Sequence, residues 1–170
     1  MRSVLTRREN FEGLAENLRK KTRQTQAMAT GLANEPVAVN RYVQVLEGAN
    51  IYPVGIVISP WAYWIAATPD RKVYVPHRQP PIGILEVKCP CVTSVLEVTY
   101  LKRVGDRLQL NHNHQYYTQV QTQLGVTGLE WCDFFVWCES DFHQETIYFD
   151  AEDWHAIKDK ADHFFFNYFL

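Results

Sequence analysis

The segment from Gly83 to Lys88 (GILEVK) constrains the fold of this chain more than any other segment. Its apolar residues predict a β-strand that is buried in a sheet, yet the strand carries Glu86 and Lys88 two residues apart. Side chains alternate across a strand, so both charges lie on the same face. A buried charge is costly unless it is paired or bound to a metal ion. The segment therefore predicts either an ion pair or a chemical site on one face of a buried strand.

Apolar spacing and turn residues predict a mixed α/β fold around this strand. Pro36 lies inside the second expected helix and predicts a kink, or a helix start near Asn34. A single domain spanning 1–170 is expected from the length, with a central mixed β-sheet flanked by helices. The expected helices cover 3–24, 26–47, 111–127 and a segment from about 152, and the expected strands cover 51–58, 62–68, 72–75, 83–88, 131–138 and 145–149.

Composition argues against several classes of protein. The chain has no run of 18 apolar residues and its N-terminal segment has no apolar core of a signal peptide. We therefore expect no membrane association and an intracellular protein, nuclear or cytoplasmic, that is not secreted. The four cysteines lack the spacing of a zinc site, and we expect buried free thiols at Cys89, Cys91, Cys132 and Cys138.

The net charge of −2 hides an uneven distribution of charge along the chain. Residues 1–107 contain 15 Lys and Arg against 9 Asp and Glu, whereas residues 108–170 contain 2 against 10. The basic part is compatible with a surface that attracts phosphates. A solvated surface without a partner explains the same charges, so charge alone leaves both interpretations open.

Asp70 follows a strand at a Pro-Asp turn, one strand before Glu86 and Lys88. A hairpin-like pairing between the strand next to Asp70 and the strand that contains Glu86 would bring Asp70 beside Glu86. Two carboxylates suit a hard cation such as Mg²⁺, which polarises a phosphate and acidifies a bound water. Lys88 would then orient that water or stabilise developing negative charge. The alternative is an ion pair of Lys88 with Glu86 or Asp70 that has no chemical role.

Four motifs occur in order along the chain. They are Gly31-x3-Glu35 with a helical run to Tyr42, Thr68-Pro69-Asp70, Leu85–Pro90 (LEVKCP) and Tyr116–Gln121 (YYTQVQ). Together they resemble the YqaJ family of viral-type recombinases, which includes the lambda-type exonucleases of the PD-(D/E)XK superfamily. The resemblance covers about 28–138 and implies a restriction-endonuclease-like core.

The resemblance also implies roles for individual residues. The implied metal ligands are Asp70, Glu86, the Val87 carbonyl and Glu35. Lys88 is the implied catalytic lysine, and Gln119 is implied to touch the attacking water or the backbone phosphate. The expected DNA contacts are Arg7, Arg8, Arg71 and Tyr117, although an exposed helix face explains Arg7 and Arg8 equally well.

The expected function is that of an Mg²⁺-dependent deoxyribonuclease, with Mn²⁺ able to substitute, that resects duplex DNA ends for recombination. A nicking or structure-specific endonuclease and a catalytically silent DNA-binding module are the alternatives. Expected partners are double-stranded DNA, a single-strand annealing protein and further copies of the chain in a ring trimer. The chain departs from the family pattern at Arg71, where a glycine is usual after the Asp. We also expect the family's first N-terminal helix to be truncated or supplied by another segment.

Overall fold

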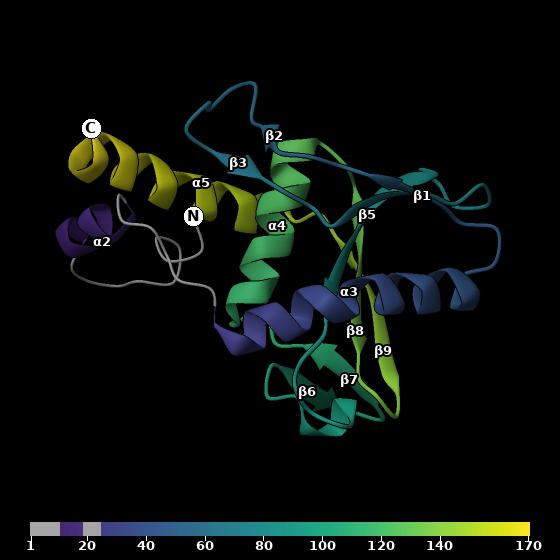
Figure 1. Cartoon of the computed structure of the whole chain (residues 1–170). Coiled ribbons are helices and arrows are strands. Elements are labelled where there is room, and N and C mark those ends of the chain that lie inside the picture. The colour runs from purple at the N-terminus through teal and green to yellow at the C-terminus, as the bar shows by residue number, and fades with distance from the viewer. Residues whose placement is uncertain (1–10, 19–24) are drawn as a thin grey trace.

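The computed structural model describes residues 11–18 and 25–170 and has a five-stranded mixed sheet at its centre (Figure 1). The strand order is β1 (Asn50–Pro53), β4 (Arg71–Tyr74), β5 (Ile82–Lys88), β8 (Trp131–Trp137) and β9 (Phe142–Tyr148). Strands β5 and β8 are parallel, and the other neighbours are antiparallel. The expected mixed sheet flanked by helices is therefore confirmed.

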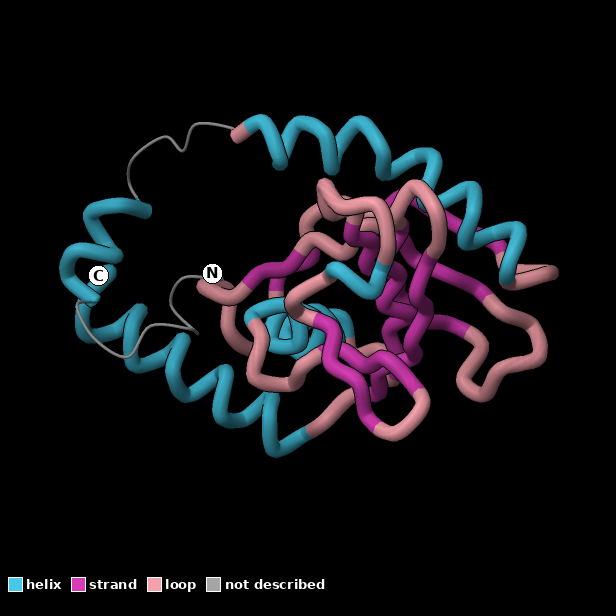
Figure 2. The backbone as a smooth tube through the Cα atoms, turned by 90° about the horizontal axis from the view of Figure 1, so that it is seen from below, coloured by secondary structure: helices cyan, strands magenta, loops and turns pink. Residues whose placement is uncertain are grey.

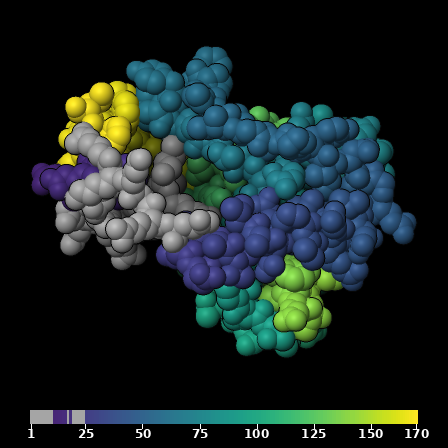
Figure 3. Space-filling model, in the orientation of Figure 1, coloured from purple at the N-terminus to yellow at the C-terminus, as the bar shows by residue number. Residues whose placement is uncertain are grey.

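Helices cover both sides of the strands. They are α3 (Gln26–Val45), α4 (Gln115–Thr127) and α5 (Ala151–Phe164). A π-helical turn (Phe165–Phe169) follows α5, and α2 (Phe11–Leu18) packs on that turn and on the end of α5. Figure 2 shows α3 on one side of the strands and α5 on the other, and Figure 3 shows α3 running across one face of the molecule. Among the described helices, none is long and apolar enough to cross a lipid bilayer.

The alternation of β5 divides the core between the two faces. Leu85 and Val87 pack with Tyr42 of α3, whereas Ile84 packs with Val120 of α4. Glu86 follows the same alternation and lies on the α4 face. The apolar residues of β5 therefore anchor the sheet to both helices, and the polar face of the strand points toward α4.

Several expected boundaries are corrected by the structure. The expected strand 51–58 is two strands, because β1 joins the central sheet and β2 (Val57–Ile58) pairs with β3 (Ala66–Ala67) in a separate ribbon. Only β3 remains of the expected strand 62–68. A second ribbon, β6 (Leu101–Val104) with β7 (Arg107–Leu110), was not expected. Its two-residue turn begins at Gly105, whose φ of 59° a glycine adopts without strain.

Two expectations concern the helices at the start of the chain. The start of a helix near Asn34 is wrong, because α3 begins at Gln26 and continues through Pro36. Thr25 caps this helix, since its hydroxyl accepts a hydrogen bond from the Met28 amide at 3.3 Å. Of the expected helix 3–24, the structure describes the part that forms α2.

A buried carboxylate stabilises the face of the sheet that packs on α3. Asp133 of β8 is fully buried and accepts hydrogen bonds from Tyr42 at 2.5 Å, Arg78 at 3.0 Å and Thr146 at 2.6 Å. The Arg78 guanidinium also lies 4.4 Å from the centroid of the Trp131 ring. One carboxylate therefore joins α3, β8, β9 and the loop before β5.

We expect Asp133→Ala to lower the free energy of unfolding by about 3–5 kcal/mol, because three donors lose their acceptor and the Arg78 charge loses its partner. Urea unfolding followed by circular dichroism measures this loss. Asp159→Ala, at an exposed position of α5, is the control and should change the free energy by no more than about 0.5 kcal/mol. Equal unfolding midpoints for the two variants would show that the network does not stabilise the fold.

Candidate active site

The pairing of β4 with β5 brings Asp70 beside Glu86. Arg71 of β4 lies opposite Leu85 of β5 in an antiparallel register, so Asp70 precedes the strand next to the Glu86 position. The Val87 amide donates a hydrogen bond to Asp70 Oδ2 at 2.7 Å. The hairpin-like pairing expected from the sequence is confirmed, and it ties the Asp70 carboxylate to the main chain of β5.

Glu86 is 1% exposed and its carboxylate accepts three hydrogen bonds. Lys88 Nζ and Gln119 Nε2 both donate to Oε1, the latter at 2.5 Å, and Gln123 Nε2 donates to Oε2 at 2.7 Å. The contact between Glu86 and Lys88 confirms that their side chains share one face of the strand. A buried carboxylate with this many donors is well satisfied, which explains how a charge fits into the strand.

Helix α4 supplies both glutamine side chains that reach Glu86. Gln119 and Gln123 are four residues apart and therefore lie on the same side of the helix. Gln121 points the other way, since its amide donates to the Tyr148 carbonyl and accepts from the Asp150 amide. The role of Gln123 was missed by sequence reasoning, although its helical spacing from Gln119 is a signal that identifies it.

Lys88 has a second contact besides Glu86. Its Nζ lies 4.5 Å from the centroid of the Tyr116 ring, which is close enough for a cation–π interaction. Tyr116 is the residue at the start of the YYTQVQ motif. The motif thus provides both a ring against Lys88 and an amide against Glu86.

Glu35 of α3 is held by Arg71. The Arg71 Nη1 lies 2.9 Å from Glu35 Oε1, and the same nitrogen donates to the Asp70 carbonyl oxygen at 2.5 Å. Arg71 therefore bridges a helix residue and a loop residue that both belong to the implied ligand set. The departure from the family pattern at position 71 places a cation directly beside these acidic groups.

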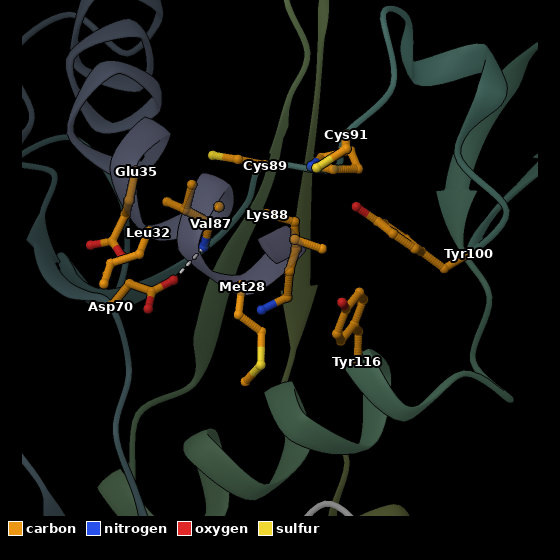
Figure 4. A pocket seen from close by; sticks show the side chains of 13 residues that line it. Met28, Leu32, Glu35, Asp70, Val87, Lys88, Cys89, Cys91, Tyr100 and Tyr116 are labelled. Atoms are coloured by element: carbon orange, nitrogen blue, oxygen red, sulfur yellow. Dashed lines mark hydrogen bonds between the residues drawn. The ribbon is translucent and has the colours of Figure 1, made fainter. Parts of the chain in front are cut away.

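Glu35, Asp70, Lys88 and Tyr116 line one cavity of about 400 Å³ (Figure 4), and Glu86 lies buried beside it. Figure 4 shows Glu35 and Asp70 on one side of it and Lys88 and Tyr116 on the other. The side chains of Met28, Leu32 and Tyr100 form an apolar and aromatic part of the cavity wall. The full lining comprises Ala27, Met28, Gly31, Leu32, Glu35, Asp70, Val87, Lys88, Cys89, Pro90, Cys91, Tyr100 and Tyr116.

The environment of Asp70 disfavours its charged form. Burial and the nearby negative charge of Glu86 raise the pKa of the Asp70 carboxyl to about 7, although the Val87 amide and the Lys88 ammonium oppose this rise. Glu35 contributes in the same direction as Glu86. The metal-free site is therefore electrostatically strained near neutral pH, and a cation bound to Asp70 would relieve this strain.

The carboxylates do not converge on one point in this structure. Among residues 11–18 and 25–170, no three His, Cys, Asp or Glu side chains lie close enough together to hold a metal ion. Glu86 is turned to its three donors and Glu35 to Arg71. The chemistry of the donors fits a hard cation, since carboxylate and main-chain carbonyl oxygens are the ligands such cations prefer. Binding of one would require these side chains to exchange partners.

The other expected site residues either lie away from the cavity or fall outside the residues that the structure describes. Tyr117 is 8% exposed and lies away from the cavity, with its ring stacked on His112 at 3.9 Å between centroids. Arg7 and Arg8 lie outside the described residues. All four cysteines have free thiols, and the expected burial is confirmed for Cys132 and Cys138. It is wrong for Cys91, which is exposed, and for Cys89, which is half-buried, because both line the cavity.

Comparison with known proteins adds a family and two similar structures. The model of the YqaJ-like viral recombinase domain matches residues 6–130. The alkaline exonuclease LHK-Exo from Laribacter hongkongensis is 26% identical over 90% of this chain and 74% of its own, with a TM-score of 0.67. The structure of LHK-Exo in complex with dAMP is 22% identical over 96% of this chain and 82% of its own, with a TM-score of 0.72. No curated protein matches this sequence.

Proposed function

Because the chain belongs to the family of YqaJ-like viral recombinase domains, we propose that it is a DNA exonuclease that resects the ends of duplex DNA. The observation that carries the proposal is the position of Asp70 and Lys88 at one cavity, with the Glu86 carboxylate buried behind it in contact with Lys88. The likeness to an alkaline exonuclease over 90% of the chain supports the same activity. The ion-pair alternative describes the contact between Glu86 and Lys88 but does not account for an open cavity beside it.

The proposed cofactor is a divalent cation, Mg²⁺ with Mn²⁺ as a substitute, held by Asp70, Glu86, Glu35 and the Val87 carbonyl. When bound, such an ion supplies a polarised phosphate and a water of lowered pKa. Glu86 must release Lys88 and Gln119 from Oε1 before that oxygen can serve as a ligand. Binding of the cation would therefore free the side chains of Lys88 and Gln119.

Lys88 and Gln119 then act on the substrate. The Lys88 ammonium is the positive group that lies nearest Glu86, and we assign it the stabilisation of the charge that develops on the phosphate oxygens. Gln119 can orient the attacking water or a phosphate oxygen through its side-chain amide. The Tyr116 ring lies 4.5 Å from Lys88 Nζ, and we assign it the role of holding that ammonium in the cavity.

The test of exonuclease activity compares two forms of the same duplex. End-labelled linear DNA and closed circular DNA are incubated with the protein and Mg²⁺, and the products are separated by size. We expect mononucleotides from linear DNA and no change in circular DNA. Nicking or linearisation of the circle would instead support the endonuclease, and binding without cleavage of either form would support a silent DNA-binding module.

We further propose double-stranded DNA as the substrate, with an annealing protein and other copies of the chain as partners. A ring trimer would place several such cavities around one DNA end. Light scattering coupled to size-exclusion chromatography measures the mass in solution. A mass of one chain at working concentrations would contradict the trimer.

A further inference from the structure

Arg71 is fixed beside the proposed metal ligands from two directions. Its guanidinium contacts the Glu35 carboxylate at 2.9 Å and the Asp70 carbonyl oxygen at 2.5 Å. The side chains of Arg71 and Glu35 are 27% and 23% exposed, so this ion pair is partly removed from water. As the first residue of β4, Arg71 follows Asp70 directly, and its backbone position is set by the pairing with β5.

The ion pair occupies an oxygen that a metal ion would use. Glu35 Oε1 accepts from the guanidinium, and a divalent cation at the same carboxylate would bring two positive groups within a few ångströms of each other. Their repulsion is strong where the surroundings are partly shielded from water. A guanidinium and a metal ion therefore compete for Glu35, and each binds it best when the other is absent.

We propose that Arg71 is a positioning residue that holds Glu35 in the metal-free site and competes with the divalent cation for it. This inference rests on the proposed nuclease function and adds a regulatory contact to the same site. Glu35 exchanges Arg71 for the cation on loading. The released guanidinium then lies beside the cavity with free donors, and a guanidinium suits the oxygens of a DNA phosphate.

The test measures Mn²⁺ affinity without DNA, from the rise in melting temperature over a series of Mn²⁺ concentrations. Arg71→Gln should bind Mn²⁺ about three- to five-fold more tightly than wild type, the factor expected for loss of a partly exposed ion pair. Arg71→Lys keeps the charge and should remain within about two-fold of wild type. Each variant is compared with its own metal-free melting temperature, so a change in stability does not affect the result.

A control variant distinguishes the direct contact between Arg71 and Glu35 from a general effect of positive charge near the site. Lys72→Gln removes a positive charge from the next residue, whose side chain is exposed. Field effects at exposed positions are weak, so this variant should bind Mn²⁺ as wild type does. Tightening by the same factor in Arg71→Gln and Lys72→Gln would overturn the proposal in favour of a general charge effect.

A second comparison tests the path through Glu35. In a Glu35→Gln background, Arg71→Gln should no longer change Mn²⁺ affinity, because the carboxylate that both cations seek is gone. A full effect of Arg71→Gln in that background would overturn the proposal. So would weaker Mn²⁺ binding by Arg71→Gln alone, since Arg71 would then hold Glu35 in its metal-binding position.

The outcomes also separate this inference from the proposed function. A wild-type protein that neither binds Mn²⁺ nor cleaves DNA contradicts the proposed function and this inference together. A wild-type protein that does both, with an Arg71→Gln variant of unchanged Mn²⁺ affinity, contradicts the competition alone and leaves the nuclease assignment in place.

Discussion

Replacing Lys88 with alanine is expected to reduce DNA cleavage at least a hundredfold while the fold survives. The positive charge of Lys88 would be lost from the phosphate in the transition state, and removal of one such group typically costs a hundred- to a thousandfold in rate. The fold should tolerate the change because Glu86 keeps hydrogen bonds from Gln119 and Gln123. Single-turnover cleavage of labelled duplex measures the rate, and circular dichroism measures the fold.

Asp70→Ala and Glu86→Ala are expected to abolish cleavage for the complementary reason that they remove proposed metal ligands. Glu86→Ala also leaves Lys88 and the side-chain amides of Gln119 and Gln123 without this acceptor, so a second variant is needed at this position. Glu86→Gln is that second variant, because glutamine has nearly the same shape as glutamate and retains one side-chain oxygen. Lys102→Ala, on the exposed face of β6, is the matched control and should cleave at the wild-type rate. Full activity of Asp70→Ala, Glu86→Ala or Lys88→Ala would exclude the replaced residue from the proposed active site.

Addition of Mn²⁺ is expected to raise the melting temperature of the wild type by about 5–10 °C when its concentration is a hundredfold above the Kd. A ligand that binds only the folded state at this excess contributes about 2.7 kcal/mol, and a domain of this size gains about 2–4 °C for each kcal/mol. Asp70→Asn should show a much smaller rise, because it loses the charge but keeps an oxygen that can accept from the Val87 amide. Equal rises in both proteins would place the metal elsewhere.

The same experiment has a defined dependence on pH. The pKa of Asp70 in the folded protein is raised to about 7, above its ordinary value. The folded state therefore binds more protons than the unfolded state between about pH 4 and 7, and the contribution of this group to stability falls as pH rises through that window. Since metal binds the ionised carboxylate, we expect Mn²⁺ affinity to increase as pH rises toward 7 and level off above it. In Asp70→Asn this pH dependence should be weaker, and the metal-free variant should melt higher than wild type at pH 8.

A Mn²⁺ affinity that does not change between pH 6 and pH 8 would contradict the raised pKa as a factor in metal binding. A metal-free Asp70→Asn that melts at a lower temperature than wild type at pH 8 would show that the ionised carboxylate stabilises the site. Either result would contradict the electrostatic explanation for Asp70 without excluding it as a metal ligand. The cleavage assay tests the role as a ligand independently.

The shared face of Glu86 and Lys88 could be predicted from the sequence because strand geometry is local. Alternation with a period of two needs only the residues of β5, and it led to the ion pair that the structure contains. The contact of Asp70 with β5 followed in the same way from two strands that are close in sequence. The resemblance of the YYTQVQ motif to the family pattern indicated Gln119, and in the structure its side-chain amide donates to Glu86.

The missed and corrected elements are those whose outcome depends on distant partners. Residues 51–58 have the composition of one strand, but β1 pairs with β4 and β2 pairs with β3, so the division is set by the available partners. The β6–β7 ribbon was missed although Gly105 and Asp106 form a typical two-residue turn. Pro36 was given too much weight, since packing of α3 on the sheet outweighs the loss of one helical hydrogen bond.

The sequence by itself determined that Glu86 and Lys88 share one face of a strand, because that periodicity is set by the backbone alone, and the resemblance of its short motifs to a family indicated the other residues that we propose for the site. Only the tertiary structure decided which side chains these residues contact. Tyr42 and Asp133 are 91 residues apart and meet because α3 packs on β8, and Glu35 meets Arg71 because α3 crosses the start of β4. Such contacts depend on how helices pack on a sheet. That packing is a property of the whole core, and no local pattern encodes it.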